Sequence, residues 1–583
     1  MGPFKLTKFF TPKSRVVHKE NDMGDSSSSI KDFSSQENVQ EKEGLVAETP
    51  FRTVLLVVAA ILPTMIVVSL DRIIMATATP KITDELNSIR DIGWYGSAYQ
   101  LASCSTQLFF SRLYQYFDNK ILFLISVLLF EAGSILCATA SVSAAVIAGR
   151  VVSGLGSAGV MAGAIAIMIP LVPLHKRVFY QGIFASIFAI SPLVGPLIGA
   201  PLPATSGSPG VGVSGSTCPW AVSASSSSSS SASRPPGAPR APFTFRCLDP
   251  VGTALFVPSI VCLLLALEWG GTTHPWSSPR IVALLVLFGI LLIAWYLSQH
   301  FGKEHATAPP RILLQRSVAA GVLFTICFGG IMLSFHYYIA IWLQAVRGLS
   351  PVESGIRTLP FVVAFVCVSI LTGATVKFVG HYAQFPIACA CCMAVAMGLV
   401  TTLRVDTEEA PLTGFLIFLG AGMGLGAQIP SIAAQTVLTS PDDSMGSSLM
   451  IFGQNLGSAI FLSVSQNVFL RSLISNMSGV VPGAGAQILA GIGSTSLRET
   501  VPARLLPAAL EAYSASIVAT MRVPLGIACV SIIPALAFEW RSVKRREKKK
   551  EEEEADEKVV SSEEGPGAEK GLWAVERKRD VGV

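Results

Sequence analysis

Long apolar runs separated by short polar segments fill most of the chain between residues 50 and 540. The runs at 53–70, 121–140 and 281–297 approach the roughly 20 residues that a helix needs to cross about 30 Å of hydrocarbon. A segment surrounded by lipid has to satisfy its own backbone hydrogen bonds, so each run predicts a helix. We predict spanning helices near residues 53–72, 93–110, 121–140, 144–170, 181–201, 251–269, 280–298, 317–345, 355–379, 383–402, 411–436, 445–469 and 515–538.

The segment 201–250 interrupts this series. It contains the serine run Ser225–Ser231 and a stretch rich in Pro and Arg at 234–242, and none of its windows is apolar enough to span a bilayer. The predicted helices are therefore odd in number. From a cytoplasmic N-terminus, an odd count places the basic stretch Lys544–Lys550 outside, against the positive-inside bias.

The charges in the loops favour one further crossing within 201–250. With that crossing, Arg311 and Lys544–Lys550 face the cytoplasm, while the acidic loop Asp406–Glu409 faces outward. The charge pattern therefore predicts an even number of crossings.

The polar segments outside the helices have simple interpretations. Residues 1–50 and 541–583 are predicted to be disordered cytoplasmic tails, because they collect charge and lack an apolar run. Asn476 begins an Asn-Met-Ser triplet in a loop predicted at 470–513. This loop would face outward, where N-glycosylation is possible.

Composition agrees with a membrane protein, since 51% of the 583 residues are hydrophobic and only 14% are charged. The net charge of +5 comes from tails and short loops without a basic, aromatic-interleaved patch, so we expect no nucleic-acid partner. Cys389, Cys391 and Cys392 have no His or acidic companions, so we expect no metal site.

Ionisable side chains inside spanning segments are costly in lipid and therefore indicate function. Arg150 is the strongest candidate; it either lines a cavity or pairs with a carboxylate, or it is locked to backbone carbonyls purely for packing. Asp71 ends the first apolar run and is either a proton site or an interfacial cap. Glu131 and Glu268 rank lower, because both could face loops or headgroups.

Small and helix-bending residues follow these charges. Gly154 and Gly156 come directly after Arg150 and let helices approach closely. The predicted helix at 181–201 contains Gly195, Pro196 and Gly199, which permit kinking and close packing.

The second half of the chain carries buried amides and aromatic rings in place of charges. Amides in lipid need water, a substrate or each other, so they indicate either a wet cavity for amphiphilic molecules or hydrogen bonds between helices. The candidate cavity residues are Tyr337, Tyr338, Trp342, Gln344, Gln428, Gln435, Gln454 and Asn455.

The sequence contains no credible P-loop, HExxH motif, nucleophile elbow or dinucleotide fingerprint. We therefore expect neither an enzyme nor a resident cofactor, and an ion gradient as the energy source.

Several strings resemble a known family. Residues 70–80 are similar to the signature that ends the first helix of fourteen-spanner drug:proton antiporters, a branch of the major facilitator superfamily. Residues 148–156 resemble the superfamily's motif B, and 182–199 resemble motif C, a mark of export. Residues 93–99 are similar to the opening of the second helix of these antiporters. The strings at 248–252, 267–271, 337–345 and 350–357 look like fungal mycotoxin-efflux members.

This resemblance implies an all-α major facilitator fold with two six-helix bundles and a two-helix insert. On this chain it implies an N-terminal bundle at 51–200 with five visible helices, an aberrant segment at 201–250 in place of the sixth helix, the insert at 251–300 and a C-terminal bundle at 315–540.

The resemblance also implies proton-coupled export of a small amphiphilic molecule by alternating access. Arg150 would tune proton coupling, Asp71 would carry the proton, and Gly195 and Pro196 would shape the rocking interface. The expected partners are the substrate, protons and the lipid bilayer. We expect a monomer in the plasma membrane, with vacuolar or vesicle membranes as the alternatives.

Two other functions fit the same sequence: a proton-coupled siderophore or nutrient importer, and a transport-impaired receptor or scaffold. Three departures from the family bear on this choice. The loop 111–120 lacks the usual leading glycine, Ala200 replaces a second glycine of motif C, and 201–250 lacks the sixth helix. A retained intron or frame-shifted gene explains the last departure, and a real insertion that destroyed the helix is the alternative.

Overall fold

The computed structural model describes part of the chain, and the described residues all belong to one unit, Thr49–Lys550. The predicted tails, apart from 541–543, lie outside the described residues, and so do the segment 201–247 and most of the predicted helix at 181–201. The structure describes residues 51–86, 92–172, 176–177, 179–184, 187, 248–271, 273–302, 306–438, 442–478, 480, 502 and 504–543.

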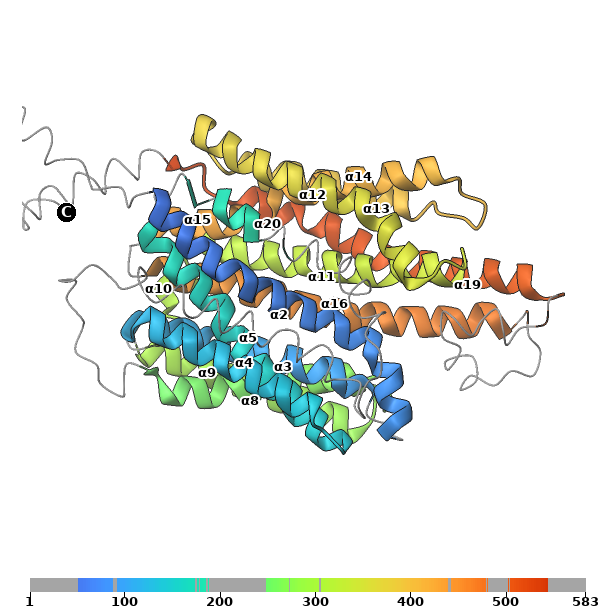
Figure 1. Cartoon of the computed structure of the whole chain (residues 1–583), viewed down its shortest axis with the longest axis horizontal. Helices are drawn as coiled ribbons and strands as arrows, with labels where there is room; N and C mark the ends of the chain where they lie inside the picture. Colours follow the sequence, from blue (N-terminus) through green and yellow to red (C-terminus); the bar gives the residue numbers. More distant parts are fainter. Residues whose placement is uncertain are drawn as a thin grey trace, which may run out of the picture. The chain divides into compact units, whose positions relative to one another are not determined.

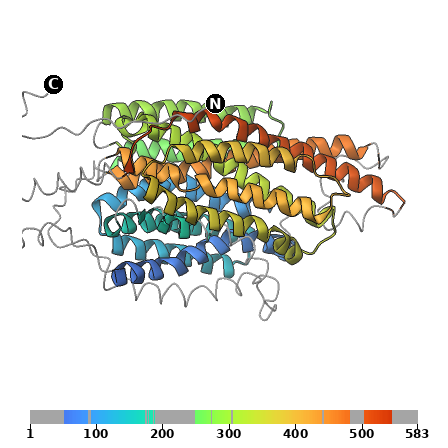
Figure 2. The same ribbon diagram turned by 90° about the horizontal axis from the view of Figure 1, so that it is seen from above.

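The described chain is built from helices that run along a common direction (Figures 1 and 2). The N-terminal helices are α2 (Phe51–Leu86), α3 (Ile92–Tyr116), α4 (Asn119–Ala138) and α5 (Ser143–Leu171). The hairpin of α8 (Pro250–Trp269) and α9 (Pro279–Gly302) follows. The C-terminal helices are α10 (Pro310–Leu313), α11 (Arg316–Ala345), α12 (Pro351–Val379), α13 (Gln384–Val400), α14 (Glu409–Gly426), α15 (Ile429–Val437), α16 (Asp443–Ser478), α19 (Leu506–Val530) and α20 (Ile532–Ala537).

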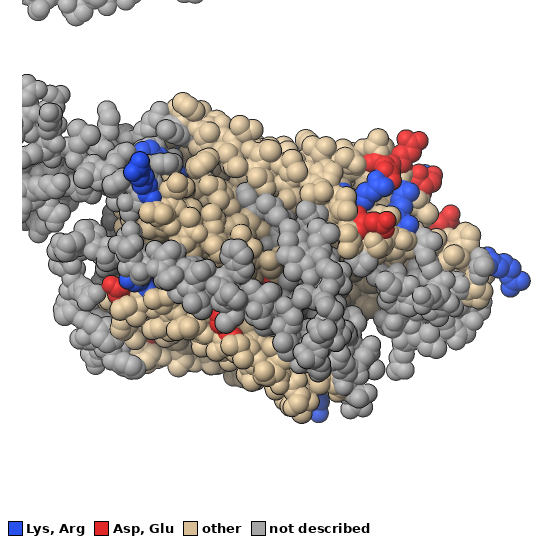
Figure 3. All heavy atoms as spheres, viewed as in Figure 1, with Lys and Arg blue, Asp and Glu red and all other residues tan. Residues whose placement is uncertain are grey.

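Ten helical stretches of the described chain are long and apolar enough to cross a membrane, and the protein is an integral membrane protein. α9 shows this most clearly, because only 11% of its apolar window is buried and residues such as Ile290 and Ile293 are exposed. Figure 3 shows the same pattern at the surface, with charges gathered mainly at the two ends of the molecule. α3 and α13 are not among the ten: α3 is rich in polar residues, and α13 has only 17 residues.

Glycines let the N-terminal helices pack at backbone distance. A Cβ on Gly156 would collide with the backbone of Phe130 in α4, and one on Gly154 would lie 2.5 Å from the carbonyl oxygen of Tyr99 in α3. α5 therefore lies directly against both α3 and α4. This arrangement is the close approach that the small residues after Arg150 predict.

One end of the helix array, which we call the basic end, collects cationic side chains. Arg177 contacts Asp443, the neighbouring Asp442 binds Arg311, and Arg316 donates to the carbonyl of Ala537 at 2.9 Å. The acidic loop that precedes α14 lies at the opposite end, where Arg357 pairs with Glu409. The acidic loop and Arg311 thus lie at opposite ends of the described helices, as the loop pattern predicts.

The basic end also bears on the question of parity. α5 ends there, because Arg177 binds the carbonyl of Val172 directly after this helix. α8 begins there, because Asp249 accepts hydrogen bonds from Thr307, close to Arg311. α5 therefore ends and α8 begins at the same side of the described helices. The number of crossings between these two points stays a prediction, because 188–247 lies outside the described residues.

Three predicted boundaries were wrong. α2 continues to Leu86, so Asp71 lies inside a helix and does not cap its end. α16 extends to Ser478 and α19 begins at Leu506, so the loop predicted at 470–513 is shorter. Asn476 consequently lies in the last turn of α16, where its amide donates to Ser516 at 2.9 Å. Apolar windows mark only the part of a helix that lies in lipid, and these helices continue beyond it.

Candidate transport site

A buried ion pair joins α2 to α5. Nη1 of Arg150 lies 2.6 Å from Oδ2 of Asp71, and their side chains are only 3% and 16% exposed. Arg150 Nε also donates to the carbonyl of Tyr95 at 2.9 Å, and the guanidinium lies 4.5 Å from the ring centre of Tyr99. The Arg150 guanidinium thus contacts a carboxylate, a backbone carbonyl and an aromatic face. These three contacts compensate for the loss of its hydration inside the bundle.

Glu131 is a second buried acid in this bundle. It is 6% exposed, and neither of its carboxyl oxygens has a hydrogen-bond partner within the described chain. The interpretation of Glu131 as a residue facing loops or headgroups was therefore wrong. Its position on α4 followed from the apolar pattern, but its burial depends on how α4 packs against its neighbours.

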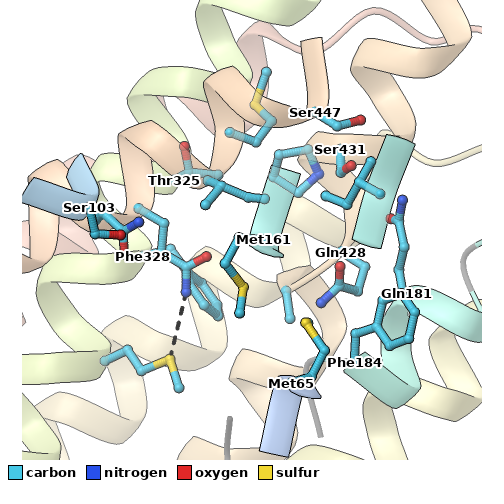
Figure 4. Close-up of a pocket in the computed structure, with 18 of the residues that line it drawn as sticks. Met65, Ser103, Met161, Gln181, Phe184, Thr325, Phe328, Gln428, Ser431 and Ser447 are labelled. Atoms are coloured by element: carbon cyan, nitrogen blue, oxygen red, sulfur yellow. Dashed lines mark hydrogen bonds between the residues drawn. The ribbon is translucent and has the colours of Figure 1, made fainter. Parts of the chain in front are cut away.

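A cavity of about 150 Å³ lies between the N-terminal helices and the C-terminal helices. Met65 of α2, Met161 of α5 and Gln181, after α5, line one side, and α11, α15 and α16 supply much of the other (Figure 4). A cavity of this volume accommodates a small aromatic molecule.

The described lining residues of this cavity are uncharged. Methionine and phenylalanine form much of the wall, and hydroxyl and amide groups interrupt it. The polar lining residues are Ser103, Ser157, Gln181, Thr325, Gln428, Ser431, Ser447, Gln454 and Asn455. Such a wall suits an uncharged amphiphilic molecule, because soft apolar surfaces adapt to its shape and polar groups orient it.

At the basic end of the cavity, a group of three residues connects the two halves of the chain. We call Arg177, Gln435 and Asp443 the latch. Arg177 Nη1 lies 3.1 Å from Gln435 Oε1 and 3.4 Å from Asp443 Oδ2, and Arg177 also donates to the carbonyls of Val172 and Ile169. All three latch residues are buried.

The latch also contacts the cavity wall. The Gln435 amide donates to Ser447 at 2.8 Å and to Ser431 at 3.3 Å, and both serines line the cavity. Gln435 itself is therefore placed in the latch and not on the lining.

A family model described as Major Facilitator Superfamily matches residues 61–238 and 243–462. The chain belongs to the major facilitator superfamily.

Two fungal efflux pumps are similar to this chain. The chain is 38% identical over 497 residues to the MFS-type efflux pump MFS1 of Trichophyton rubrum, covering 84% of this chain and 91% of that pump. It is 37% identical over 505 residues to the efflux pump aflT of Aspergillus parasiticus, covering 84% of this chain and 96% of that pump.

A solved structure supports the fold alone. The human organic anion transporter MFSD10 (TETRAN) superposes with a TM-score of 0.52 at 14% identity, over 82% of this chain and 99% of the transporter.

The remaining predicted residues of this superfamily member lie in several places. Gln428, Gln454 and Asn455 line the cavity. Tyr337, Tyr338, Trp342 and Gln344 are not among its described lining residues: Tyr337 is 49% exposed, and the buried Trp342 donates to Ser514 at 3.0 Å. These rings therefore belong to helix packing and to the surface of α11. Gly195, Pro196 and Gly199 lie outside the described residues.

Sequence reasoning missed Gln181, the methionines of the wall and the latch. Gln181 directly precedes the string that resembles motif C, and this position gave a signal that could have found it. The latch had no comparable signal, because Arg177 and Asp443 are 266 residues apart and each falls between two of the predicted helices.

Proposed function

We propose that this protein is a proton-coupled efflux transporter that exports small amphiphilic molecules, such as a secondary metabolite, toxin or drug, by alternating access. The observation that carries this proposal is the cavity shared by the two halves of the chain, with the latch at one end of it. Rocking of one half against the other would break the latch and expose the cavity at the basic end. The positive-inside bias assigns the basic end to the cytoplasm.

The ion pair of Arg150 and Asp71 supplies a means of coupling to protons. When Asp71 is ionised, its attraction to Arg150 holds α2 against α5. When Asp71 takes up a proton, most of this attraction is lost, and Arg150 keeps its contacts with Tyr95 and Tyr99. Protonation would therefore loosen the contact between two helices that both line the cavity.

Export is favoured over import by the relatives, whose names include efflux pumps. We infer that the proton gradient is the energy source without a resident cofactor, that the transporter works as a monomer, and that it resides in the plasma membrane.

Membrane vesicles with an imposed pH gradient test this function. Export-direction flux of a fluorescent amphiphile that collapses with the gradient supports the proposal. Import-direction flux would favour the nutrient importer, and absence of flux would favour the receptor or scaffold. Arg150→Ala should abolish gradient-driven export while the protein still reaches the membrane, and undiminished export by this variant would refute the role of the pair.

A further inference from the structure

Gln181 is a buried amide that has no hydrogen-bond partner among the described residues. Its side chain is 2% exposed, and neither its nitrogen nor its oxygen finds a partner within the described chain. Burying an amide without hydrogen bonds carries the full cost of its removal from water, so such groups are rare unless something else satisfies them. The group that satisfies Gln181 is therefore to be sought in the cavity that it lines.

The surroundings of Gln181 define the shape and polarity of this missing partner. Figure 4 labels Gln181 beside Phe184, and both residues line the cavity. Met65 and Met161 add polarisable apolar surface from α2 and α5. Flat aromatic rings suit such a wall, because methionine sulfur and phenylalanine rings both make favourable contacts with aromatic rings.

The chemistry of the amide adds a second condition. A glutamine side chain presents two N–H donors beside one carbonyl acceptor. A ligand that presents a donor beside a carbonyl satisfies both sides of this amide at once, as a lactam does. A charged ligand would find no opposite charge among the described lining residues, so the favoured ligand is uncharged.

We propose that Gln181 is a specificity-determining residue that recognises uncharged aromatic molecules carrying a hydrogen-bond donor next to a carbonyl. The proposal deepens the proposed function, on which it rests, by naming the substrate class of the same cavity. The site discriminates through the amide, since a ligand without the donor leaves the Gln181 oxygen buried and unsatisfied.

Two matched probes test this recognition. 2-Quinolone is a flat, uncharged two-ring lactam, and 1-methyl-2-quinolone differs from it by blocking the N–H donor. Binding of each probe to the purified full-length protein in nanodiscs, without a pH gradient, is measured by calorimetry. We expect 2-quinolone to bind roughly ten- to a hundredfold more tightly than its methylated analogue, which corresponds to one satisfied buried hydrogen-bonding group.

Gln181→Leu and Gln181→Met should remove this preference by weakening 2-quinolone alone. Gln107→Leu is the matched control, because Gln107 is also buried and lacks partners for its amide within the described chain, but it does not line the cavity. The apparent Tm of the Gln181 variants should stay level or rise, because an unsatisfied amide is removed.

Several results would overturn the proposal: equal binding of the two probes, absence of binding by both, an unchanged preference in the Gln181 variants, or a lost preference in Gln107→Leu. A fall in Tm of the Gln181 variants with unchanged binding would identify a structural amide. Gradient-driven export in vesicles is scored separately. Export that persists while the probe preference fails would reject this inference and leave the proposed function intact.

Discussion

Arg150 shows how a single charge can be kept inside a helix bundle. Only 3% of its side chain is exposed, and its three contacts come from α2 and α3, not from its own helix. Removing one partner of a buried pair leaves an uncompensated charge, whereas replacing both with apolar residues can be nearly neutral. Stability and transport therefore respond differently to single and double substitution.

Asp71→Asn should lower the stability by about 3 kcal/mol, because Arg150 loses its counter-charge while remaining buried. The double variant Asp71→Leu with Arg150→Met should recover most of this loss, since no charge remains. Neither variant should show export driven by a pH gradient. Thermal unfolding in detergent and vesicle transport measure the two effects, and export by the double variant would contradict a role of the pair in coupling.

At the scale of elements, the N-terminal helices depend on glycine for their spacing. Gly156 lies against the backbone of Phe130, so a larger residue at this position would force α4 and α5 apart. A Cβ on Gly289 in α9 would meet no atom within 4 Å, because this glycine faces open space. The two positions hold the same residue type in the same kind of helix but have opposite surroundings.

Gly156→Ala should therefore destabilise the protein by about 1–3 kcal/mol through overpacking. Gly289→Ala should be neutral or stabilise by up to about 1 kcal/mol, because alanine is the better helix former. The apparent Tm should fall for purified Gly156→Ala and should stay level or rise for purified Gly289→Ala. Equal shifts would show that the contact between α4 and α5 does not limit stability.

At the scale of the whole molecule, the latch and the cavity form one connected system. Arg177, from the N-terminal half, binds Gln435 and Asp443, from the C-terminal half, and Gln435 reaches the serines of the wall. Opening the cavity at the basic end requires these contacts to break. In the transport cycle that we propose, the strength of the latch would therefore set how often the cavity opens at that end.

Arg177→Ala should raise the accessibility of the cavity from the basic end roughly tenfold or more, because it removes hydrogen bonds to a charged group. Ser447 is fully buried in the cavity wall, so a cysteine at this position is a probe of access to the cavity. The measurement is the rate at which a membrane-impermeant maleimide labels Ser447→Cys, with and without Arg177→Ala. Labelling of the native cysteines, measured on the protein that retains Ser447, is subtracted from this rate.

Arg311→Ala is the control for the latch, because Arg311 binds Asp442 within the C-terminal half at 2.8 Å. It removes a neighbouring ion pair without separating the halves. Labelling of Ser447→Cys should stay at the parent rate, and equal acceleration by both variants would show that the latch has no special role.

Much of the helix arrangement could be predicted from the sequence because lipid imposes a simple rule. An apolar run of sufficient length has to become a helix, and loop charges set its direction. Arg150 and Asp71 could be singled out for the same reason, since a charge inside such a run is costly and needs a partner. The motifs that resemble the drug:proton antiporters then indicated the superfamily.

Only the tertiary structure decided which side chains meet. It paired Arg150 with Asp71, 79 residues away, and joined Arg177 to Asp443 across the two halves. Gln428, Gln454 and Trp342 were all candidates for the cavity, as amides or aromatic rings within spanning helices. In the structure, Gln428 and Gln454 line the cavity, whereas Trp342 packs inside the C-terminal helices. The sequence determined that Arg150, Asp71, Gln428, Gln454 and Trp342 lie on spanning helices. The rotation of each helix and the choice of its neighbours come from packing between distant segments, which an apolar pattern along one segment does not encode.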